Sequence, residues 1–212
     1  PLKKEDILSS WSGIRPLIKS ANKSNTQEIV REHLIISSKN GLISIAGGKW
    51  TTYRKMAQDM MDFLVDKNYL EKRKSCKTKK YKLAGNEEKH KDLEKLISFY
   101  AISKSTKESL ITLYGNNATV VLNLASELNN FELIHKDFPY LKAEIIYCVE
   151  YEFVKKPIDF LSRRIGLCFV NKEASIDSVD AVCLEMGKLY NWDDERLKKE
   201  IAECKEYIYK NF

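Results

Sequence analysis

The sequence lacks the long apolar runs of a membrane-spanning protein. No stretch approaches the roughly 18 uninterrupted apolar residues that a spanning helix requires. Only 8 glycines and 4 prolines occur among 212 residues, too few for collagen-like or long disordered sequence. With 43% hydrophobic and 10% aromatic residues, the chain has side chains for one large core or two small ones. We therefore expect a folded protein that is not integral to a membrane.

Paired cysteines are also missing. The five cysteines are an odd number without a C-x-x-C pair, which excludes a complete disulfide framework and gives no usual zinc spacing. We expect reduced, mostly core cysteines and no metal site. The chain begins at Pro1 without an initiator Met or a charged-then-apolar leader, so no targeting signal is visible. These features are typical of a piece of a longer protein.

Charge divides the sequence into two parts. Residues 1–82 hold 18 Lys/Arg against 8 Asp/Glu, whereas the remainder is slightly acidic. The change coincides with Glu71–Lys82 (EKRKSCKTKKYK), which has seven basic residues and reads as a solvated loop or linker. We predict a partial α+β domain over 1–75, a basic linker over 76–82 and an all-helical domain over 83–212.

The first part shows strand patterns followed by one helix. Asp6–Ile18 and His33–Ala46 carry the β-branched and aromatic residues of strands, and Lys39-Asn40-Gly41 is a hairpin turn signal. From Tyr53 to Leu64 the apolar residues recur at helical spacing, and Thr51 or Thr52 can cap that helix. A strand therefore runs through Gly47-Gly48-Lys49 into a helix.

The second part reads as about seven helices joined by short loops, a compact all-α domain. A longer helix is predicted from Tyr140 to Val154, and another from Pro157 to Cys168. Asp193-Asp194-Glu195 supplies the acidic first turn of the last helix. Further apolar stripes occur at Leu93, Leu96, Ile97 and Tyr100; Leu110, Leu113 and Tyr114; Val120, Val121, Leu124 and Leu128; and Val179, Cys183 and Met186.

The strand-to-helix junction is a candidate anion site. Two glycines allow close backbone approach, a helix N-terminus presents N–H groups, and Lys49 adds a full positive charge. For an isolated Gly-Gly-Lys, a plain tight turn with a solvated lysine is the favoured interpretation. Arg15, held extended by Pro16, and Arg31 are single surface arginines by default. Together with Lys49 they form a candidate three-cation phosphate pocket.

The order of these motifs resembles a known family. SWSGIRPLI, then VREHLI, then GLISIAGGKWTTYRKMAQDMMD are similar to the C-terminal part of the FAD-dependent, quinone-linked glycerol-3-phosphate dehydrogenases. The helical half continues the resemblance with LYGNNA, FPYLKAEIIYCVEYEFVKKPIDFLSRRIGLCF and DAVCLEMGKLYNWDDERLKKEI. The resemblance covers nearly the whole chain. It implies an enzyme that oxidises sn-glycerol 3-phosphate to dihydroxyacetone phosphate and passes electrons through FAD to quinone.

The resemblance also implies roles for individual residues. Arg15 and Arg31 would bind the substrate phosphate, and Lys49 would be a catalytic group beside the flavin and the substrate. Gly47, Gly48 and Thr51 would belong, with Lys49, to the flavin-contacting turn. Negative charge develops at one end of the flavin during hydride transfer, and a cation placed there stabilises it.

Some family features are absent from these residues. No G-x-G-x-x-G occurs, so the part that holds the ADP portion of FAD must lie upstream. The family's catalytic histidine also lies in that part, and no calcium-binding loop is present. We expect the isolated chain to be inactive and to retain no FAD. His33 is interpreted as a structural neighbour of Arg31, and His90 and His135 as surface or packing residues.

The implied partners are glycerol 3-phosphate, quinone, a membrane surface and, as an open option, a second copy of the chain. The location would be peripheral to the mitochondrial inner membrane in a eukaryote or to the cytoplasmic membrane face in a bacterium. The alternative is a non-catalytic helical module whose basic loop docks to a membrane or partner. Nucleic-acid binding is the least favoured interpretation. Five charged residues of the helical part are interpreted as ion pairs that orient two helices: Glu144, Glu150 and Glu152, with Arg163 and Arg164.

Overall fold

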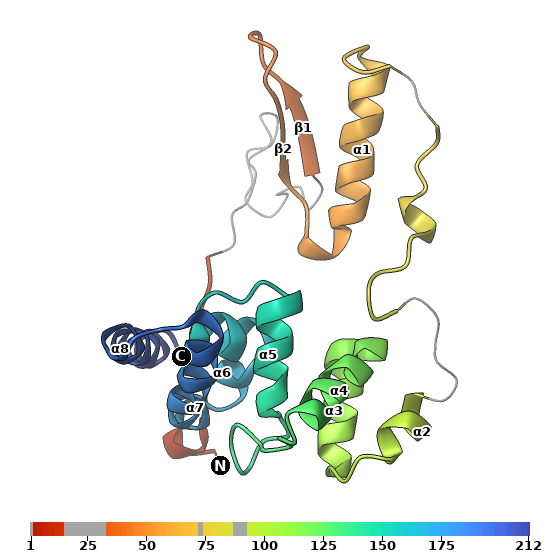
Figure 1. Cartoon of the computed structure of the whole chain (residues 1–212). Helices are drawn as coiled ribbons and strands as arrows, with labels where there is room; N and C mark the ends of the chain where they lie inside the picture. The colour runs from red at the N-terminus through yellow and green to blue at the C-terminus, as the bar shows by residue number, and fades with distance from the viewer. Residues whose placement is uncertain (1, 15–32, 72–73, 87–92) are drawn as a thin grey trace. The chain divides into compact units, whose positions relative to one another are not determined.

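The computed structural model describes residues 2–14, 33–71, 74–86 and 93–212. The chain forms two compact units, residues 13–82 and residues 1–12 together with 83–212 (Figure 1). The first unit holds a β-hairpin and one helix, and the second holds the remaining α-helices of the described ranges. This division of secondary structure confirms the α+β class, with strands and a helix before a helical domain.

The predicted hairpin over His33–Ala46 is confirmed and extends one residue further. Strands β1 (His33–Ser37) and β2 (Ile43–Gly47) pair antiparallel, with Ile35 opposite Ile45. The turn between them is closed by a backbone bond of 2.8 Å from the Ser38 amide to the Leu42 carbonyl. The Lys39-Asn40-Gly41 signal therefore lies at the tip of the hairpin.

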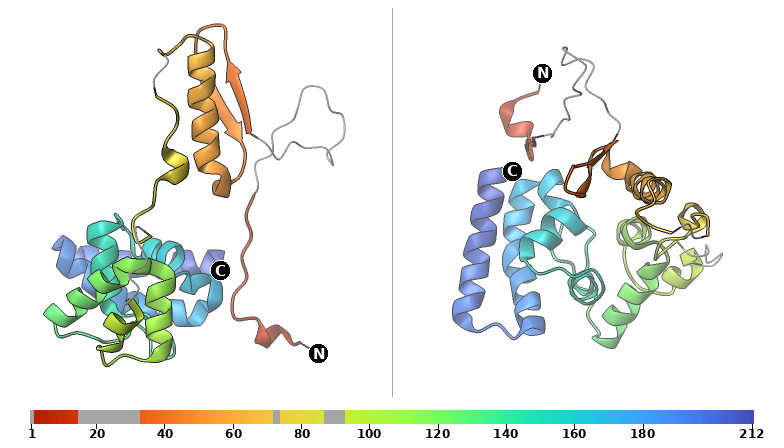
Figure 2. Two further views of the ribbon diagram at one scale, coloured as in Figure 1. Left: turned by 90° about the vertical axis from the view of Figure 1, so that its right-hand side faces the viewer. Right: turned by 90° about the horizontal axis from the view of Figure 1, so that it is seen from above.

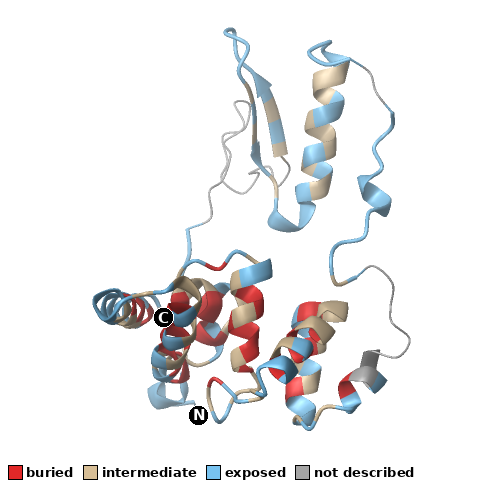
Figure 3. Ribbon diagram, viewed as in Figure 1, coloured by how far each residue is buried: buried red, intermediate tan, exposed pale blue. Residues whose placement is uncertain are grey.

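Helix α1 (Tyr53–Asp66) follows a short 3₁₀ turn, η3 (Trp50–Thr52), and contacts β1 (Figure 1). The predicted helix is therefore confirmed. None of the described residues in 33–71 and 74–82 is buried, and Figure 3 shows only half-buried and exposed positions on this hairpin and helix. On the hairpin, Leu34 and Ile36 are exposed. The described part of this unit therefore has no closed core of its own.

The strand predicted over Asp6–Ile18 is wrong for the part that the structure describes. A 3₁₀ turn, η1, covers Lys4–Asp6, and residues 7–14 have no regular structure. The backbone groups of this segment bond to the helical unit instead of to a neighbouring strand. The Ser10 amide donates to the Phe212 carbonyl at 3.3 Å, and the Leu8 carbonyl accepts from the Lys172 amide at 2.9 Å.

Aromatic contacts hold the same segment in place. The Trp11 and Phe169 rings form a T-shaped pair at a centroid distance of 5.4 Å, and Phe169 forms another with Phe212 at 5.0 Å. The Ser9 hydroxyl donates to the Cys168 carbonyl at 2.7 Å. Residues 2–12 therefore act as a strap that joins the C-terminal residue to the preceding helices.

The helical unit confirms the prediction of about seven helices. Helices α7 and α8 lie side by side in Figures 1 and 2. No helix in the described ranges is both long enough and apolar enough to cross a membrane. The helices are α2 (Leu93–Ser98), α3 (Lys104–Tyr114), α4 (Ala118–Glu127), α5 (Lys142–Tyr151), α6 (Leu167–Val170), α7 (Lys172–Tyr190) and α8 (Asp194–Asn211), with a π-helix, η6, over Asp159–Arg164.

Local capping explains where three of these helices begin. The side chains of Ser103, Asn171 and Asp193 each accept a hydrogen bond from the backbone amide three residues later, at 2.7 to 3.1 Å. Such N-caps satisfy amides that have no partner within the helix. Asp193, predicted in the first turn, is thus the cap itself.

Two predicted helices differ from the structure. The helix expected from Tyr140 to Val154 begins only at Lys142, because Leu141 forms an extended bridge with Leu133. It ends at Tyr151, two residues before a left-handed residue, Phe153, with φ 57°. The helix expected from Pro157 to Cys168 is divided at Gly166, where φ is 68°.

The core of the chain lies in the helical unit (Figure 3). Four of the five free cysteines are buried within it, and only Cys76 is exposed, as the sequence predicted. Burial raises the pKa of the Cys168 thiol to about 11 and that of Cys183 to about 12. Fully buried apolar residues include Leu110, Val121, Leu122, Leu141, Ile145, Phe160, Leu161, Leu167, Val179, Val182, Met186 and Ile208.

Two glycines join the start of the helical unit to the end of α3. Gly85 and Gly115 both have positive φ, 81° and 56°. A Cβ on Gly85 would lie 2.6 Å from the Tyr114 carbonyl oxygen, and one on Gly115 would overlap the Gly85 carbonyl oxygen. The Asn116 amide donates to that same Gly85 carbonyl at 2.9 Å. No residue larger than glycine fits at either position without backbone movement.

Candidate functional site

The candidate site is the turn between β2 and α1, where Gly47 and Gly48 both have positive φ, 81° and 74°. The hydroxyl of Thr52 closes this turn: it accepts from the Lys49 amide at 3.1 Å and donates to the Lys49 carbonyl at 2.9 Å. Thr52 is the N-cap residue of α1, but its side chain bonds to Lys49 and not to a helix amide. The predicted strand-to-helix junction is present, with the η3 turn between Lys49 and the first residue of α1.

Packing against α1 explains why Gly48 is a glycine. A Cβ added there would lie 2.5 Å from the sulfur of Met56. Helix α1 therefore occupies the space next to Gly48, so a side chain at this position would clash with the helix even without a ligand. The glycine-rich turn has a structural role whether or not it binds an anion.

An open, mostly apolar hollow of about 570 Å³ lies beside this turn. The Trp50 side chain is 90% exposed and Tyr53 is 52% exposed, with their ring centroids 6.5 Å apart. Lys49 is exposed at the same place. The hollow offers methionine and aromatic side chains to a planar ring and one cation to a negative charge. It is lined by Ile45, Gly47, Gly48, Lys49, Trp50, Tyr53, Met56, Ala57, Met60 and Met61.

His33 serves the packing of the hairpin on the helix. Its Nε2 lies 3.1 Å from Oδ2 of Asp59 on α1. Lys55 also pairs with Asp59, and its hydrogen bond is the main cause that lowers the pKa of this carboxyl group. His33 therefore has a structural contact within the described residues. Its expected contact with Arg31 lies outside them.

The structure brings together only some of the residues predicted to form the site. Gly47, Gly48, Lys49 and Thr51 lie in one turn, and Thr51 is exposed within η3. Arg15 and Arg31, the predicted phosphate ligands, lie outside the described residues. Their convergence with Lys49 therefore stays a prediction.

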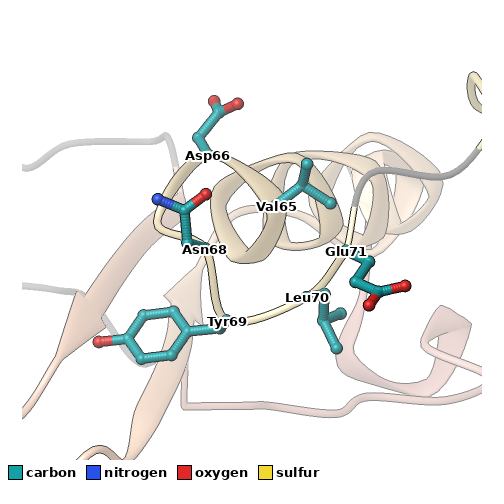
Figure 4. A pocket seen from close by; sticks show the side chains of 6 residues that line it. All are labelled: Val65, Asp66, Asn68, Tyr69, Leu70 and Glu71. Carbon is teal, nitrogen blue, oxygen red and sulfur yellow. The ribbon is translucent and has the colours of Figure 1, made fainter.

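A second hollow, of about 510 Å³, lies at the opposite end of α1 (Figure 4). Its lining contains two carboxylates, Asp66 and Glu71, and no cation. The side chains in Figure 4 diverge from the turn and do not point toward one common position. The Tyr69 hydroxyl lies 3.1 Å from the Ser37 hydroxyl at the end of β1. The described side chains of this hollow therefore offer no positive charge to a phosphate. It is lined by Val65, Asp66, Asn68, Tyr69, Leu70 and Glu71.

The predicted ion pairs of the helical unit are partly correct. Nε of Arg164 lies 2.7 Å from Oε2 of Glu152, as expected, whereas Arg163 pairs with Asp159 at 2.9 Å. The prediction is wrong for Glu144. This carboxyl group is fully buried, and none of the described cations pairs with it.

Two uncharged donors hold Glu144 in place of an arginine. Oε1 accepts from the Leu141 amide at 2.6 Å, and Oε2 accepts from the Tyr114 hydroxyl at 2.9 Å. Burial raises the pKa of Glu144 to about 7. Glu144 lies three residues after Leu141, the N-cap of α5, and this spacing lets its side chain reach back to the N-cap amide. The sequence therefore contained a signal for this contact. The contact with Tyr114, thirty residues away, left no such signal.

His135 is a packing residue. Its ring forms a T-shaped pair with Phe138 at a centroid distance of 5.5 Å, and its Nε2 lies 3.9 Å from a carboxylate oxygen of Asp177. His90 lies outside the described residues. Among the side chains that the structure describes, no group of three His, Cys, Asp or Glu residues is arranged to hold a metal ion.

Comparisons with known proteins give a consistent result. Residues 76–197 match the family model described as the C-terminal domain of alpha-glycerophosphate oxidase. Over 98% of its length, the chain is 32% identical to the mitochondrial glycerol-3-phosphate dehydrogenase of Saccharomyces cerevisiae and 31% identical to that of Homo sapiens. It spans 37% and 29% of these two relatives.

One solved structure is similar over nearly the whole chain. It is the X-ray structure of the glycerol-3-phosphate dehydrogenase from Bacillus halodurans complexed with FAD. The TM-score is 0.73 and the identity is 28%, over 99% of this chain and 41% of the other. The match therefore includes the hairpin and α1 as well as the helical unit.

Proposed function

Because the chain belongs to the family described as the C-terminal domain of alpha-glycerophosphate oxidase, we propose that it is the C-terminal part of a flavoenzyme oxidising sn-glycerol 3-phosphate to dihydroxyacetone phosphate. One observation carries this proposal: 98% of the chain aligns with relatives named glycerol-3-phosphate dehydrogenase. The alignment extends through the glycine-rich turn and is not confined to the helical unit. A non-catalytic helical module would not need the hairpin and its turn.

The proposed cofactor is FAD, which, when bound, would accept a hydride from the substrate. The turn fits such a group, since an apolar hollow able to take a planar ring adjoins Lys49. We assign Gly47, Gly48 and Thr51 to contact the flavin, and Lys49 to stabilise the negative charge that develops there. The hollow is open, so other parts of the enzyme would complete it.

Arg15 and Arg31 are the proposed ligands of the substrate phosphate. An arginine presents paired donors that match a phosphate group, and the phosphate, on the carbon next to the one that is oxidised, takes no part in the oxidation itself. The two arginines would therefore bind and orient the substrate, and Lys49 would act at the reacting end.

The chain does not supply the whole active site in this proposal. Its 212 residues contain no G-x-G-x-x-G for the ADP portion of FAD, and the relatives are more than twice as long. We expect the isolated chain to be colourless and inactive. The proposed electron acceptor is quinone, and the proposed location is the surface of the mitochondrial inner membrane. The names of the eukaryotic relatives support the mitochondrion. A homodimer is compatible with the proposal.

Substitutions in the longer enzyme containing this chain separate the two proposed roles. Arg15→Ala and Arg31→Ala each remove a charge-assisted contact, so kcat/KM for glycerol 3-phosphate should fall by roughly one to two decades. Slow oxidation of unphosphorylated glycerol should change much less. Lys49→Ala should act mainly on kcat, because the charge at the flavin grows during hydride transfer. Lys39→Ala, which removes an exposed lysine at the hairpin tip, is the matched control.

Equal losses toward glycerol 3-phosphate and glycerol in the arginine variants would show that neither arginine binds the phosphate. A change in KM alone for Lys49→Ala would remove Lys49 from the chemical step. Wild-type kinetics are expected for Lys39→Ala.

A further inference from the structure

The basic segment after α1 is fully exposed and is not used by the proposed active site. Every residue from Lys74 to Lys82 is exposed. Five of these are lysines, and none forms an ion pair with a carboxylate of the described ranges. The segment also lacks any acidic residue. Its positive charge is therefore not paired with any carboxylate that the structure describes. The five are Lys74, Lys77, Lys79, Lys80 and Lys82.

Contacts with α1 give this segment a defined place. The Arg54 guanidinium on α1 donates to the Thr78 hydroxyl at 3.3 Å and to the Gln58 side-chain oxygen at 2.8 Å. Cys76 lies 3.0 Å from the same Thr78 hydroxyl. A 3₁₀ turn, η4, covers Thr78–Lys80. The central lysines thus extend from a turn that is attached to a helix.

Exposed apolar side chains lie among and directly after these lysines. Tyr81 is 79% exposed and Leu83 is 61% exposed. A tyrosine beside lysines is typical of segments at the membrane–water interface, where the ring inserts at the level of the headgroups. A nucleic acid is the less suitable partner, since a single-turn 3₁₀ helix is too short to read a groove and one aromatic ring gives little stacking.

We propose that Lys74–Lys82 is a docking segment for an anionic phospholipid surface, with the lysines contacting headgroups and Tyr81 entering the interface. The inference deepens the proposed peripheral location and rests on it only for its biological setting. A lysine near an anionic surface contributes about 1 kcal/mol, which corresponds to roughly a five-fold change in partitioning. The interaction is electrostatic, so it weakens as salt shortens the screening length.

The test is sedimentation of the 212-residue chain with vesicles of phosphatidylcholine, with and without phosphatidylserine. It requires neither flavin nor turnover, so its outcome is independent of the proposed activity. We expect binding only to the anionic vesicles, and a loss of most binding when salt rises from about 0.1 M to about 0.5 M. The triple variant K77Q/K79Q/K80Q should bind about a hundred-fold more weakly.

Two further variants control for folding and for net charge. K77R/K79R/K80R keeps the charge and should bind like the parent. K39Q/K136Q/K198Q removes three exposed lysines that lie elsewhere in the chain and should stay within about three-fold of the parent. Equal losses in the two glutamine variants would overturn the proposal, as would equal binding to neutral vesicles. Tighter binding to duplex DNA than to anionic vesicles at the same salt would also overturn it, in favour of a nucleic-acid partner.

Discussion

The stability of the helical unit should depend on the ionisation of Glu144. The folded-state pKa of this buried carboxyl group is raised to about 7 from an ordinary value of 4.5. Its protonated form is therefore favoured in the folded chain and stabilises it. This contribution to the free energy of unfolding is complete below about pH 4.5 and is lost as pH rises through about 7. The full shift corresponds to roughly 3 kcal/mol, of which about 2 kcal/mol is lost between about pH 5.5 and 8.5.

Glu144→Gln keeps the shape and an oxygen acceptor but removes the titration. Nearby Tyr114, Tyr140 and Cys148 all have pKa values raised by burial, so they do not titrate in this window. Urea unfolding followed by far-UV circular dichroism, at about pH 5.5 and pH 8.5, measures the free energy of unfolding. The difference between the parent and Glu144→Gln should change by about 2 kcal/mol between the two pH values.

The matched control is Glu132→Gln. Lys142 holds the pKa of this exposed carboxyl group below its usual range, so it stays ionised across the window and its replacement should add no pH dependence. If the parent and Glu144→Gln instead lost stability in parallel as pH rose, burial of an ionisable Glu144 would not be the cause.

Three further predictions concern the two glycines, the strap and the relative protection of helices and hairpin. Gly85→Ala and Gly115→Ala should each lower the free energy of unfolding by roughly 1–3 kcal/mol, because φ is positive at both positions and a Cβ would overlap a carbonyl oxygen. The control is Gly13→Ala, since a Cβ there meets no atom within 4 Å. An equal loss of stability in the control would refute the reasoning. Trp11→Ala should increase hydrogen exchange in the last turn of α8 through loss of its contact with Phe169, and unchanged exchange would show that the strap does not stabilise the C-terminus. In the parent chain, amides of α7 and α8 should be protected far more than those of β1 and β2, since no described residue of the hairpin is buried; uniform protection would contradict this.

Local signals predicted much of the fold. The hairpin followed from Lys39-Asn40-Gly41 between apolar residues, and the last helix followed from the acidic residues at its start. Such signals act over a few residues, so the sequence alone displays them. The junction at Gly47-Gly48-Lys49 was found for the same reason: strand periodicity ends there and helical periodicity begins.

Features that depend on distant contacts were not predictable in the same way. Residues 7–14 resemble a strand in composition, but their backbone bonds to residues such as Phe212 and Lys172 replace a strand partner. Glu144 was assigned to an ion pair because charged residues on neighbouring helices usually pair, whereas its partner is the hydroxyl of Tyr114, thirty residues away. At the candidate site, the turn was found, and the convergence of the two arginines with Lys49 stays a prediction because both arginines lie outside the described residues.

Anaerobic reduction of bound flavin tests the central claim most directly. The longer protein containing this chain should purify yellow, and glycerol 3-phosphate should bleach the visible flavin band at one equivalent of substrate per FAD. The isolated 212-residue chain, mixed with FAD and substrate, should show no bleaching. A colourless longer protein, or a flavin band unaffected by glycerol 3-phosphate, would contradict the assignment of this chain to a glycerol 3-phosphate-oxidising flavoenzyme.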